Sequence, residues 1–486
     1  MTNDSKNLGI LLFVGFLYVL PFIIGGHLYV DDFLRIEIPY GWDHNGRYFS
    51  TVLSNLIGNG HVLILSPFTM MIAALFLIYP AHKISNVFFG GELSFAKASF
   101  SLSLLLSPFF INNLAYQYDA ILMSASVGMA AMAAYYCYRG VSSNLFYAAA
   151  FILLILAISS YQSSIAVYLS IILILAIHSM MAGKATIFSA IKFCVIAGVL
   201  MLVAYALYKK VIFNPDDMSE YTKMRSEMLS IDMYTLKNMF TSYLKFKEIF
   251  YDLFHGFIGK TLLLYVTLPF AVILLKKGLS LPVKITSIVF YLFIIFLSFG
   301  MLLILKNPPV TSRSMVSGGV IIMASTMIIF TNITFKRFDW VSVVPMVISF
   351  IFVSCFFMLQ NINYSRIDNV LMRTNAVLSL QNKDYQKIYL KINKPSSASE
   401  PYRKAFPFIY NMNRYFYTGN PFMDKVSHLK LGYSIYPCDS GCKKNRIRWN
   451  CEIQRSKHDI ERARWTSNCY SELIILMPTL LLASPL

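Results

Sequence analysis

The chain has 486 residues, of which 57% are hydrophobic and 14% are charged, and its 42 Lys plus Arg against 24 Asp plus Glu give a formal net charge of +18. Leu, Ile, Phe and Met occur in long runs. The length of these runs approaches the length that a helix needs to cross a bilayer, which is about 20 residues. This composition excludes an ordinary soluble domain and predicts a polytopic membrane protein.

Apolar segments recur along the first three quarters of the chain. They predict an all-α bundle of about 11 transmembrane helices over residues 1–360. The first segment lacks a small-residue cleavage site, which indicates a retained helix rather than a removed signal peptide. The segments are 8–29, 62–81, 98–115, 120–138, 146–160, 164–182, 187–208, 261–275, 285–305, 316–335 and 340–360.

Basic residues indicate the orientation of these segments. With the N-terminus in the cytoplasm, every inner connection contains Lys or Arg, as the positive-inside rule expects. Basic residues also occur in outer connections, so the rule favours this orientation without deciding it. An odd number of spans then sends the C-terminal region outside. The outer connections are 30–61, 116–119, 161–163, 209–260 and 306–315.

The long outer segment 209–260 begins with Lys209 and Lys210 and then mixes Met, Leu and Phe with Lys and Glu. This is an amphipathic pattern without a spanning run. It predicts one or two helices that lie in the interface on the outer side of the membrane. Such a surface suits the entrance of a lipid substrate, and it suits a simple membrane anchor equally well.

The region 361–486 predicts a small α+β domain, with a helical opening and strands at 385–392 and 446–450. The last apolar run, 473–482, is too short to span a membrane and indicates a buried strand or an interfacial contact. Over residues 361–486, 19 Lys plus Arg against 9 Asp plus Glu give a net charge of +10. This charge suits an anionic membrane or phosphate-bearing glycolipids, or simply keeps the domain soluble. Without a binding motif, nucleic acid is not expected as a partner.

Three cysteines, Cys137, Cys194 and Cys355, lie in or at apolar spans, where a small apolar side chain explains them. The remaining four are in the polar C-terminal region, with 3, 8 and 17 residues between them, which fits no paired zinc-ribbon spacing. Because an outer compartment is oxidising, the pattern predicts two disulfides with the pairing left open. These four are Cys438, Cys442, Cys451 and Cys469.

Candidate chemistry is concentrated in the first outer loop. Asp31 and Asp32 precede Arg35 by about one helical turn. Carboxylates at a membrane surface can accept a proton from an attacking hydroxyl, and guanidinium groups can bind a phosphate with two hydrogen bonds. The structural alternative is a salt bridge between Asp31 and Arg35 that closes a helix, with Trp42 as an interfacial anchor. Further candidates in this loop are Glu37, Trp42 and Arg47.

The elements Asp31-Asp32-x-x-Arg35, Gly41-Trp42 and Gly46-Arg47 resemble the first-loop pattern of the phage-encoded, serotype-converting O-antigen glucosyltransferases of type II, which belong to the polytopic GT-C class. Tyr118-Asp119 and Arg313 in later outer connections extend the resemblance. It implies a GT-C-like membrane domain with a periplasmic C-terminal domain in the bacterial inner membrane. It also implies undecaprenyl-phosphate-glucose as the donor and a rhamnose of lipid-linked O-antigen as the acceptor.

The resemblance further implies an inverting displacement in which one carboxylate is the base, and we assign this role to Asp31 or Asp32, with Asp32 slightly preferred. The leaving phosphate needs charge stabilisation more than a proton. Asp119 could orient the acceptor or pair with an arginine. No cofactor or metal site is predicted, although a divalent metal requirement is left open. The candidates for binding the phosphate are Arg47, Arg35 and Arg313, with Lys209 and Lys210 as a second group.

Other functions remain open at this stage. A lipid-linked glycan flippase would also have many spans, but its ionisable residues should lie in the middle of spans. Here nearly all charges lie at the ends of spans, which favours a transferase. A GT-C transferase for a different sugar or for lipid A, and a non-catalytic polysaccharide-binding membrane protein, are the remaining alternatives.

Overall fold

The computed structural model describes residues 3–140, 143–227, 233–332, 336–381, 388–391, 397–413, 435–437, 446–447 and 472–475. The chain forms two compact units. The first contains residues 1–357 and 404–412, and the second contains residues 358–403 and 413–486. Every side chain of the candidate site described below belongs to the first unit.

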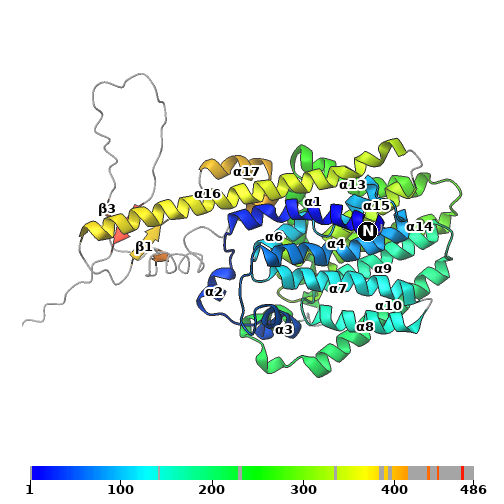
Figure 1. The fold of residues 1–486 in the computed structure, drawn as a ribbon, viewed down its shortest axis with the longest axis horizontal. Helices are drawn as coiled ribbons and strands as arrows, with labels where there is room; N and C mark the ends of the chain where they lie inside the picture. Colours follow the sequence, from blue (N-terminus) through cyan, green and yellow to red (C-terminus); the bar gives the residue numbers. More distant parts are fainter. Residues whose placement is uncertain are drawn as a thin grey trace, which may run out of the picture. The chain divides into compact units, whose positions relative to one another are not determined.

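The first unit is a bundle of apolar helices. The axes of α4, α7, α9 and α10 run alongside one another (Figure 1). Long apolar runs become helices in a membrane because a helix satisfies its backbone hydrogen bonds internally. In the described residues, seven helices are long and apolar enough to cross a bilayer, which confirms the predicted polytopic class. They are α1 (Asn3–Gly25), α4 (Phe68–Phe89), α7 (Ala120–Arg139), α9 (Ser164–Met181), α10 (Ile187–Leu207), α13 (Gly256–Leu275) and α16 (Val344–Gln381).

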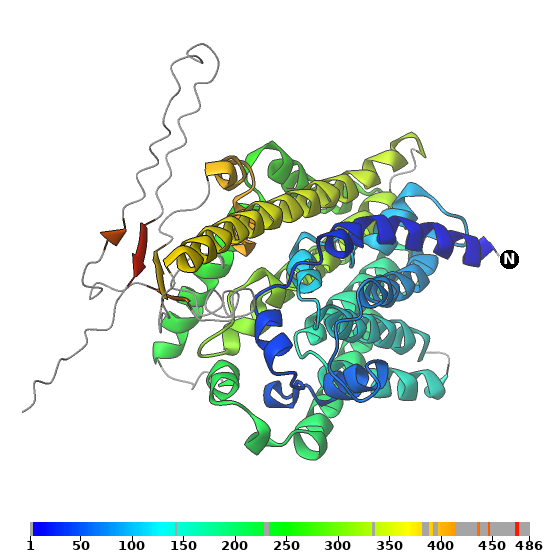
Figure 2. The same ribbon diagram turned by 60° about the vertical axis from the view of Figure 1, so that its left-hand side comes forward.

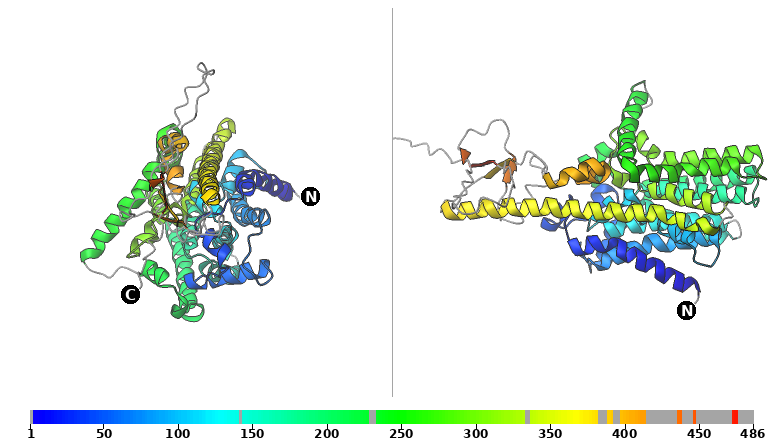
Figure 3. Two further views of the ribbon diagram at one scale, coloured as in Figure 1. Left: turned by 90° about the vertical axis from the view of Figure 1, so that its left-hand side faces the viewer. Right: turned by 90° about the horizontal axis from the view of Figure 1, so that it is seen from above.

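Burial separates inner helices from outer ones. In α15 (Gly318–Phe330) every residue from Gly318 to Ile329 is buried, and 94% of the apolar window of α9 is buried. The corresponding values are 28% for α1 and 17% for the helix that begins at Ile187. Apolar helices exposed at the edge of a bundle suit contact with lipid. Figures 2 and 3 show α1, in blue, at such an edge.

Three predicted spans form apolar helices that are too short to be counted as membrane spans by their length alone. The segments 146–160, 285–305 and 316–335 correspond to α8 (Asn144–Ile158), α14 (Leu281–Leu297) and α15. After α14 the chain continues as the short helix η6 (Gly300–Ile304). The predicted total of about 11 spans therefore stays a prediction.

The predicted span 98–115 is wrong as a single helix. The chain forms α5 (Phe95–Leu102), then η2 (Pro108–Phe110) and α6 (Ile111–Ala115). Pro108 lacks an amide donor and pushes the residue before it out of the helical region, and Ser107 is extended at ψ 129°. All residues from Ser99 to Ala115 are buried. The apolar character of this segment thus reflects burial in protein rather than contact with lipid.

The two long connections that are predicted to lie outside pack against each other. The first contains α2 (Asp32–Glu37), η1 (Asp43–Asn45) and α3 (Tyr48–Ile57), and α2 and α3 lie at one end of the bundle (Figure 1). The second contains η4 (Tyr208–Ile212), η5 (Pro215–Asp217), α11 (Glu220–Ser226) and α12 (Met233–Leu253). His44 Nδ1 lies 2.9 Å from the Asp217 carbonyl oxygen, and Thr222 Oγ1 donates to Asn45 Oδ1 at 2.9 Å. This docking fixes the loop that contains Arg47.

The C-terminal region contains a four-stranded sheet with the order β2-β1-β4-β3. β1 pairs with β2 in parallel and with β4 antiparallel, and β3 pairs with β4 antiparallel. β1 lies inside the predicted strand 385–392, and β3 lies inside 446–450. The strands are β1 (Ile388–Lys391), β2 (Ile435–Pro437), β3 (Arg446–Ile447) and β4 (Glu472–Ile475). Further short helices of the described residues are η8 (Lys336–Val343), η9 (Ser397–Ser399), α17 (Glu400–Ala405) and α18 (Pro407–Met412).

Three of the seven cysteines lie in the described part of the chain, and four do not. Cys137, Cys194 and Cys355 are free thiols. Cys438, Cys442, Cys451 and Cys469 lie outside the described residues. We predict that these four form two disulfides, each of which stabilises the domain by about 2–4 kcal/mol. Thiol labelling of the unfolded, unreduced protein should then detect only the three free thiols. Detection of four additional thiols, or of a bound zinc ion, would contradict this prediction.

Candidate active site

Charged side chains from four distant segments meet at one end of the bundle. Asp31 and Asp32 lie at the start of α2, Arg35 lies in its last turn, and Arg47 immediately precedes α3. Asp119 precedes α7, and Arg313 lies in the short helix η7 (Ser312–Ser314) before α15. Each of these segments is a connection at a helix end, so the directions of the helices bring them to the same end of the bundle.

Asp119 is the centre of this cluster. It is 1% exposed, and its Oδ1 accepts hydrogen bonds from Arg35 Nη1 at 3.1 Å and from Trp42 Nε1. Arg313 Nη2 lies 3.9 Å from its Oδ2. Arg35 is itself 3% exposed. Buried charges are tolerated only when they are paired and hydrogen-bonded, so the carboxylate and the guanidinium groups depend on each other.

The charges of the neighbouring arginines determine the ionisation of Asp119. Burial by itself would raise the pKa of its carboxyl group, but Arg35, Arg313 and Arg47 together outweigh burial and hold the pKa below its ordinary value. Asp119 is therefore an ionised anchor for the arginines. A group with a lowered pKa that is already hydrogen-bonded is poorly suited to accept a proton from a substrate hydroxyl.

Asp32 is completely buried and is bound by the backbone. Its Oδ2 accepts from the amides of Tyr29 and Gln117, both at 2.9 Å, and its Oδ1 accepts from the amide of Tyr118 at 3.3 Å. Burial raises the pKa of Asp32 to about 7, against the opposing effect of these amide donors. The side chain ties the start of α2 to the turn before α7.

The backbone that leads into Asp32 is strained. Val30 has φ +46°, which is unusual for a β-branched residue and costs about 1–3 kcal/mol. Asp31 and Asp32 follow directly. The hydrogen bonds that Asp32 accepts offset the energetic cost of the conformation at Val30. The turn directs Asp32 into the protein and leaves Asp31 partly open to solvent.

Asp31 is the accessible carboxylate of the pair. Its side chain is 33% exposed, and its Oδ2 lies 3.3 Å from Arg313 Nη1. The Arg313 guanidinium also lies over the Tyr116 ring, 4.2 Å from its centre. Although burial opposes it, the Tyr116 phenol and the carboxylates of Asp31 and Asp119 raise the pKa of Arg313 well above its ordinary value. Arg313 therefore stays cationic between two carboxylates.

Arg47 is a cation without an ion-pair partner in the part of the chain that the structure describes. Its guanidinium lies 4.6 Å from the centre of the Tyr161 ring, and its buried Nε has no hydrogen-bond partner. Burial lowers the pKa of Arg47, partly offset by the nearby Asp119. A partly buried cation with an unused donor is suited to bind an anion.

Two glycines shape the loop around Arg47. Gly46 has φ +66°, a conformation that favours glycine, and its carbonyl accepts from Tyr208 Oη at 2.5 Å and Gln162 Nε2 at 3.1 Å. At Gly41 a Cβ atom would lie 2.7 Å from Thr51 Cγ2. The amide of Trp42 donates to Thr51 Oγ1 at 2.7 Å, which requires this close approach.

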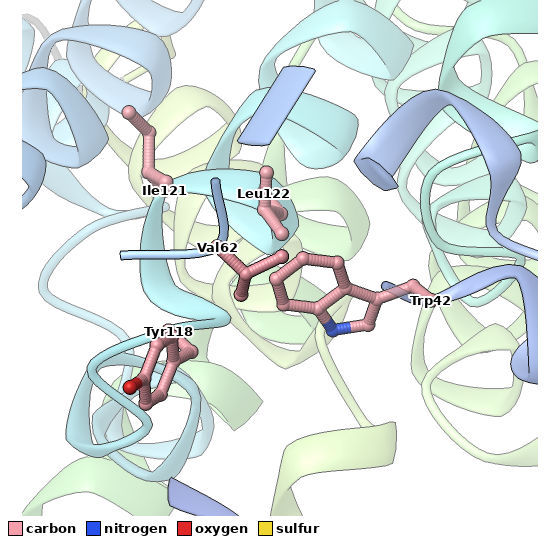
Figure 4. Packing of buried hydrophobic residues seen from close by; sticks show 5 residues of the cluster. All are labelled: Trp42, Val62, Tyr118, Ile121 and Leu122. Carbon is pink, nitrogen blue, oxygen red and sulfur yellow. The ribbon is translucent and has the colours of Figure 1, made fainter. Parts of the chain in front are cut away.

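Trp42 joins the site to the core. Its indole is 1% exposed and packs with Val62, Tyr118, Ile121 and Leu122 (Figure 4). The Arg35 guanidinium lies 4.3 Å from the centre of its ring system. Trp42 is therefore a buried support for Arg35 and Asp119, and the alternative interpretation as an interfacial anchor is wrong. Likewise Arg35 pairs with Asp119, whereas a salt bridge to Asp31 was the alternative expectation.

Some predicted residues lie away from this cluster. Lys209 and Lys210 are exposed, and the Lys209 ammonium lies over the Phe213 ring at 4.3 Å rather than next to the carboxylates. The side chain of Glu37 lies outside the described residues. Within the described chain, no group of three or more His, Cys, Asp or Glu residues gathers as a metal site would require.

Three residues of the site were not predicted from the sequence. Tyr161 lies against Arg47, and its hydroxyl donates to the Arg313 carbonyl at 2.9 Å. Tyr116 lies against Arg313, and the Gln117 amide binds Asp32. The only sequence indication of Tyr161 is its position in the tight connection 161–163. Aromatic rings in contact with two of the arginines limit the orientations that their guanidinium groups can adopt.

The fold and the site define a polytopic membrane protein with a buried cluster of carboxylates and arginines at one end of its helices. Residues 20–332 match the family described as Glucosyl transferase GtrII. The chain belongs to this family and is thus a glycosyltransferase of the membrane. All the charged residues described above lie inside the matched segment.

A relative from Salmonella phage P22 is described as an uncharacterised 55.3 kDa protein in the gtrB 5′ region. It is 27% identical over 272 residues, which are 56% of this chain and 55% of the relative. The similarity therefore spans about half of each protein. No solved structure matches the chain.

Proposed function

We propose that the protein transfers glucose from undecaprenyl-phosphate-glucose to a rhamnose of lipid-linked O-antigen at the periplasmic face, and so changes the serotype. The observation that carries this proposal is the cluster in which Asp31 and Arg313 are paired at 3.3 Å beside Arg47, a cation with no ion-pair partner among the described residues. An accessible carboxylate next to arginines suits a reaction that removes a proton from an alcohol and releases a phosphate.

The proposed reaction is a single inverting displacement. The acceptor oxygen bonds to the anomeric carbon while the bond from that carbon to the phosphate oxygen breaks, and the phosphate leaves with the electron pair. A carboxylate takes the proton from the acceptor hydroxyl. Asp31 is suited to this role because its carboxylate is partly open to solvent, whereas both oxygens of Asp32 are bound by backbone amides. We therefore assign the base to Asp31 and a positioning role to Asp32, although sequence reasoning slightly preferred Asp32.

The arginines would stabilise the departing phosphate. Arg47 has unused donors, and Arg313 lies between Asp31 and Asp119. Because the leaving phosphate gains negative charge in the transition state, a fixed cation beside it lowers the barrier. Arg35 is held by Asp119 and Trp42, so its role in this proposal is to fix the position of Asp119.

The test of this function is the composition of the O-antigen. The protein is expressed in cells that make polyprenyl-phosphate-glucose and in matched cells that lack the synthesis of this donor, and the O-antigen is analysed by mass spectrometry. We expect one additional hexose per repeat only when the donor is made. A hexose that appears in both strains, or unmodified O-antigen in both, would contradict the proposal.

Arg47→Ala should raise the KM for the donor more than the KM for the acceptor, because the proposed partner of Arg47 is the donor phosphate. Loss of a charge-assisted hydrogen bond of about 1.5–3 kcal/mol predicts an increase of about 10–150-fold. Lys184→Ala removes an exposed cation after α9 and is the matched control, with no expected change. Equal increases for donor and acceptor would contradict the assignment of Arg47 to the phosphate.

The proposed location is the bacterial inner membrane with the N-terminus in the cytoplasm and residues 361–486 in the periplasm. Gly91 and Asp216 are exposed residues in connections predicted to lie on opposite sides. In intact spheroplasts, a membrane-impermeant maleimide should label Asp216→Cys, and it should label Gly91→Cys only after permeabilisation. The parent chain gives the background. Labelling of both variants from the same side would contradict this topology.

A further inference from the structure

A second feature near the site is an apolar cavity of about 330 Å³. Its walls come from α12, α13, α14 and α15, together with η2, and include the rings of Phe109, Phe250, Phe254 and Phe299. Pockets for small ligands begin at about 300 Å³ and are mostly apolar. The lining contains no carboxylate and one charged residue, Lys247. Such a cavity selects a hydrocarbon chain rather than a sugar.

Two chain connections place this cavity next to the charged cluster. Arg313 lies five residues before Gly318, which begins α15 and lines the cavity. Phe109 also lines it, and Asn112 on the following helix donates to Ser312 Oγ at 3.1 Å, beside Arg313. The cavity and the cluster are therefore neighbours at the same end of α15.

The opening of the cavity has the polarity expected for a charged lipid. On α12, Tyr243, Lys247 and Phe250 follow one another at helical spacing and all line the cavity. Lys247 is exposed, and Leu263 on α13 is 39% exposed, so these residues mark the open side. A cation at the opening and aromatic rings inside are complementary to a long hydrocarbon chain that ends in a phosphate.

We propose that this cavity binds the isoprene units nearest the phosphate in the polyprenyl chain of the sugar donor, and that Lys247 and the arginines of the site contact its phosphate from two sides. This inference rests on the proposed function, because it names where that donor is held. We choose the donor rather than the acceptor because the cavity adjoins Arg313, which faces the proposed leaving phosphate. The chain would thereby fix the distance between the anomeric carbon and Asp31.

Leu263→Trp tests the proposal by filling the open side of the cavity. Leu264→Trp is the matched control, since Leu264 is the next residue on the same helix, is 66% exposed and does not line the cavity. Loss of apolar contacts in a pocket changes discrimination by about 10–200-fold. We expect the KM for the donor to rise at least about tenfold in Leu263→Trp while the KM for the acceptor stays unchanged, and Leu264→Trp to behave like the parent chain.

A binding measurement separates this site from the transfer reaction. The probe is a polyprenyl monophosphate without sugar that carries a photoreactive diazirine on its second isoprene unit. It should crosslink to α13 or α15 in the parent chain and in Leu264→Trp, and much less in Leu263→Trp. Lys247→Ala should weaken binding of this probe and leave binding of the uncharged polyprenol unchanged, whereas Lys245→Ala, an exposed residue that does not line the cavity, should change neither.

Several results would overturn the proposal. An increase in the KM for the acceptor alone would assign the cavity to the acceptor lipid. Displacement of the probe by equal concentrations of ordinary phospholipid would make it a general lipid site. Unchanged crosslinking in Leu263→Trp would place the chain elsewhere. If the probe crosslinks as expected but no glucose is transferred from any donor, the proposed function fails and the lipid site is supported on its own.

Discussion

Asp31→Asn should leave a folded protein whose turnover is reduced by about 10²–10⁴-fold, the usual contribution of a positioned general base. Asn has nearly the same shape as Asp but cannot take the proton from the acceptor hydroxyl. The Asp31 side chain is 33% exposed and its ion pair with Arg313 is partly solvated, so its removal should cost at most about 1 kcal/mol of stability. Initial rates with saturating donor and acceptor, together with the melting temperature, measure the two effects.

Asp32→Asn is the comparison that separates a base from a positioning residue. The amide of Asn would direct N–H groups toward the backbone amides of Tyr29, Gln117 or Tyr118, which now donate to Asp32. We therefore expect lower stability together with lower activity in this variant. If Asp32→Asn is as stable as the parent chain and inactive while Asp31→Asn remains active, the base is Asp32. If both variants keep normal turnover, the acidic pair has no catalytic role.

The apolar pattern of the sequence predicts the membrane class well, because hydrocarbon forces long apolar runs into helices. It fails at 98–115, where the apolar residues are buried in protein instead of facing lipid. Hydropathy cannot distinguish these two environments. Pro108 was the local indication that the helix must break, and the four serines at 99, 101, 103 and 107 were a further sign that the segment is not exposed to lipid.

The residue types of the site were also predictable, but their partners were not. Spacing along the chain suggested, as the structural alternative, a pair between Arg35 and Asp31, and the observed partner of Arg35 is Asp119, which is 84 residues away. Spacing likewise cannot tell which of two adjacent carboxylates turns inward. That choice depends on the backbone amides of Gln117 and Tyr118, which tertiary structure brings to Asp32.

Asp119→Asn should destabilise the protein by about 3–5 kcal/mol, because it removes the charge that compensates buried guanidinium groups. Arg35 is 3% exposed and donates to Asp119 Oδ1, and Arg313 approaches Oδ2. Denaturant titration in a mild detergent measures the free energy of unfolding. Glu227→Gln is the matched control: Glu227 pairs with Lys306 at 2.8 Å, both side chains are about half exposed, and the expected cost is at most about 1 kcal/mol.

A second substitution distinguishes an unpaired charge from a simple loss of packing. In Arg35→Met/Asp119→Asn the guanidinium that donates to Asp119 is absent as well, and replacement of buried ion pairs by apolar residues is often neutral. The double variant should therefore recover a large part of the stability lost in Asp119→Asn, although it should not recover activity. If the two substitutions are instead additive, the groups are not coupled and the cluster is not held together by charge. If they show the expected coupling, the ion pair between Arg35 and Asp119 stabilises the fold. The same pair then also fixes the positions of Arg313 and Asp31, because Arg313 bridges the carboxylates of Asp31 and Asp119.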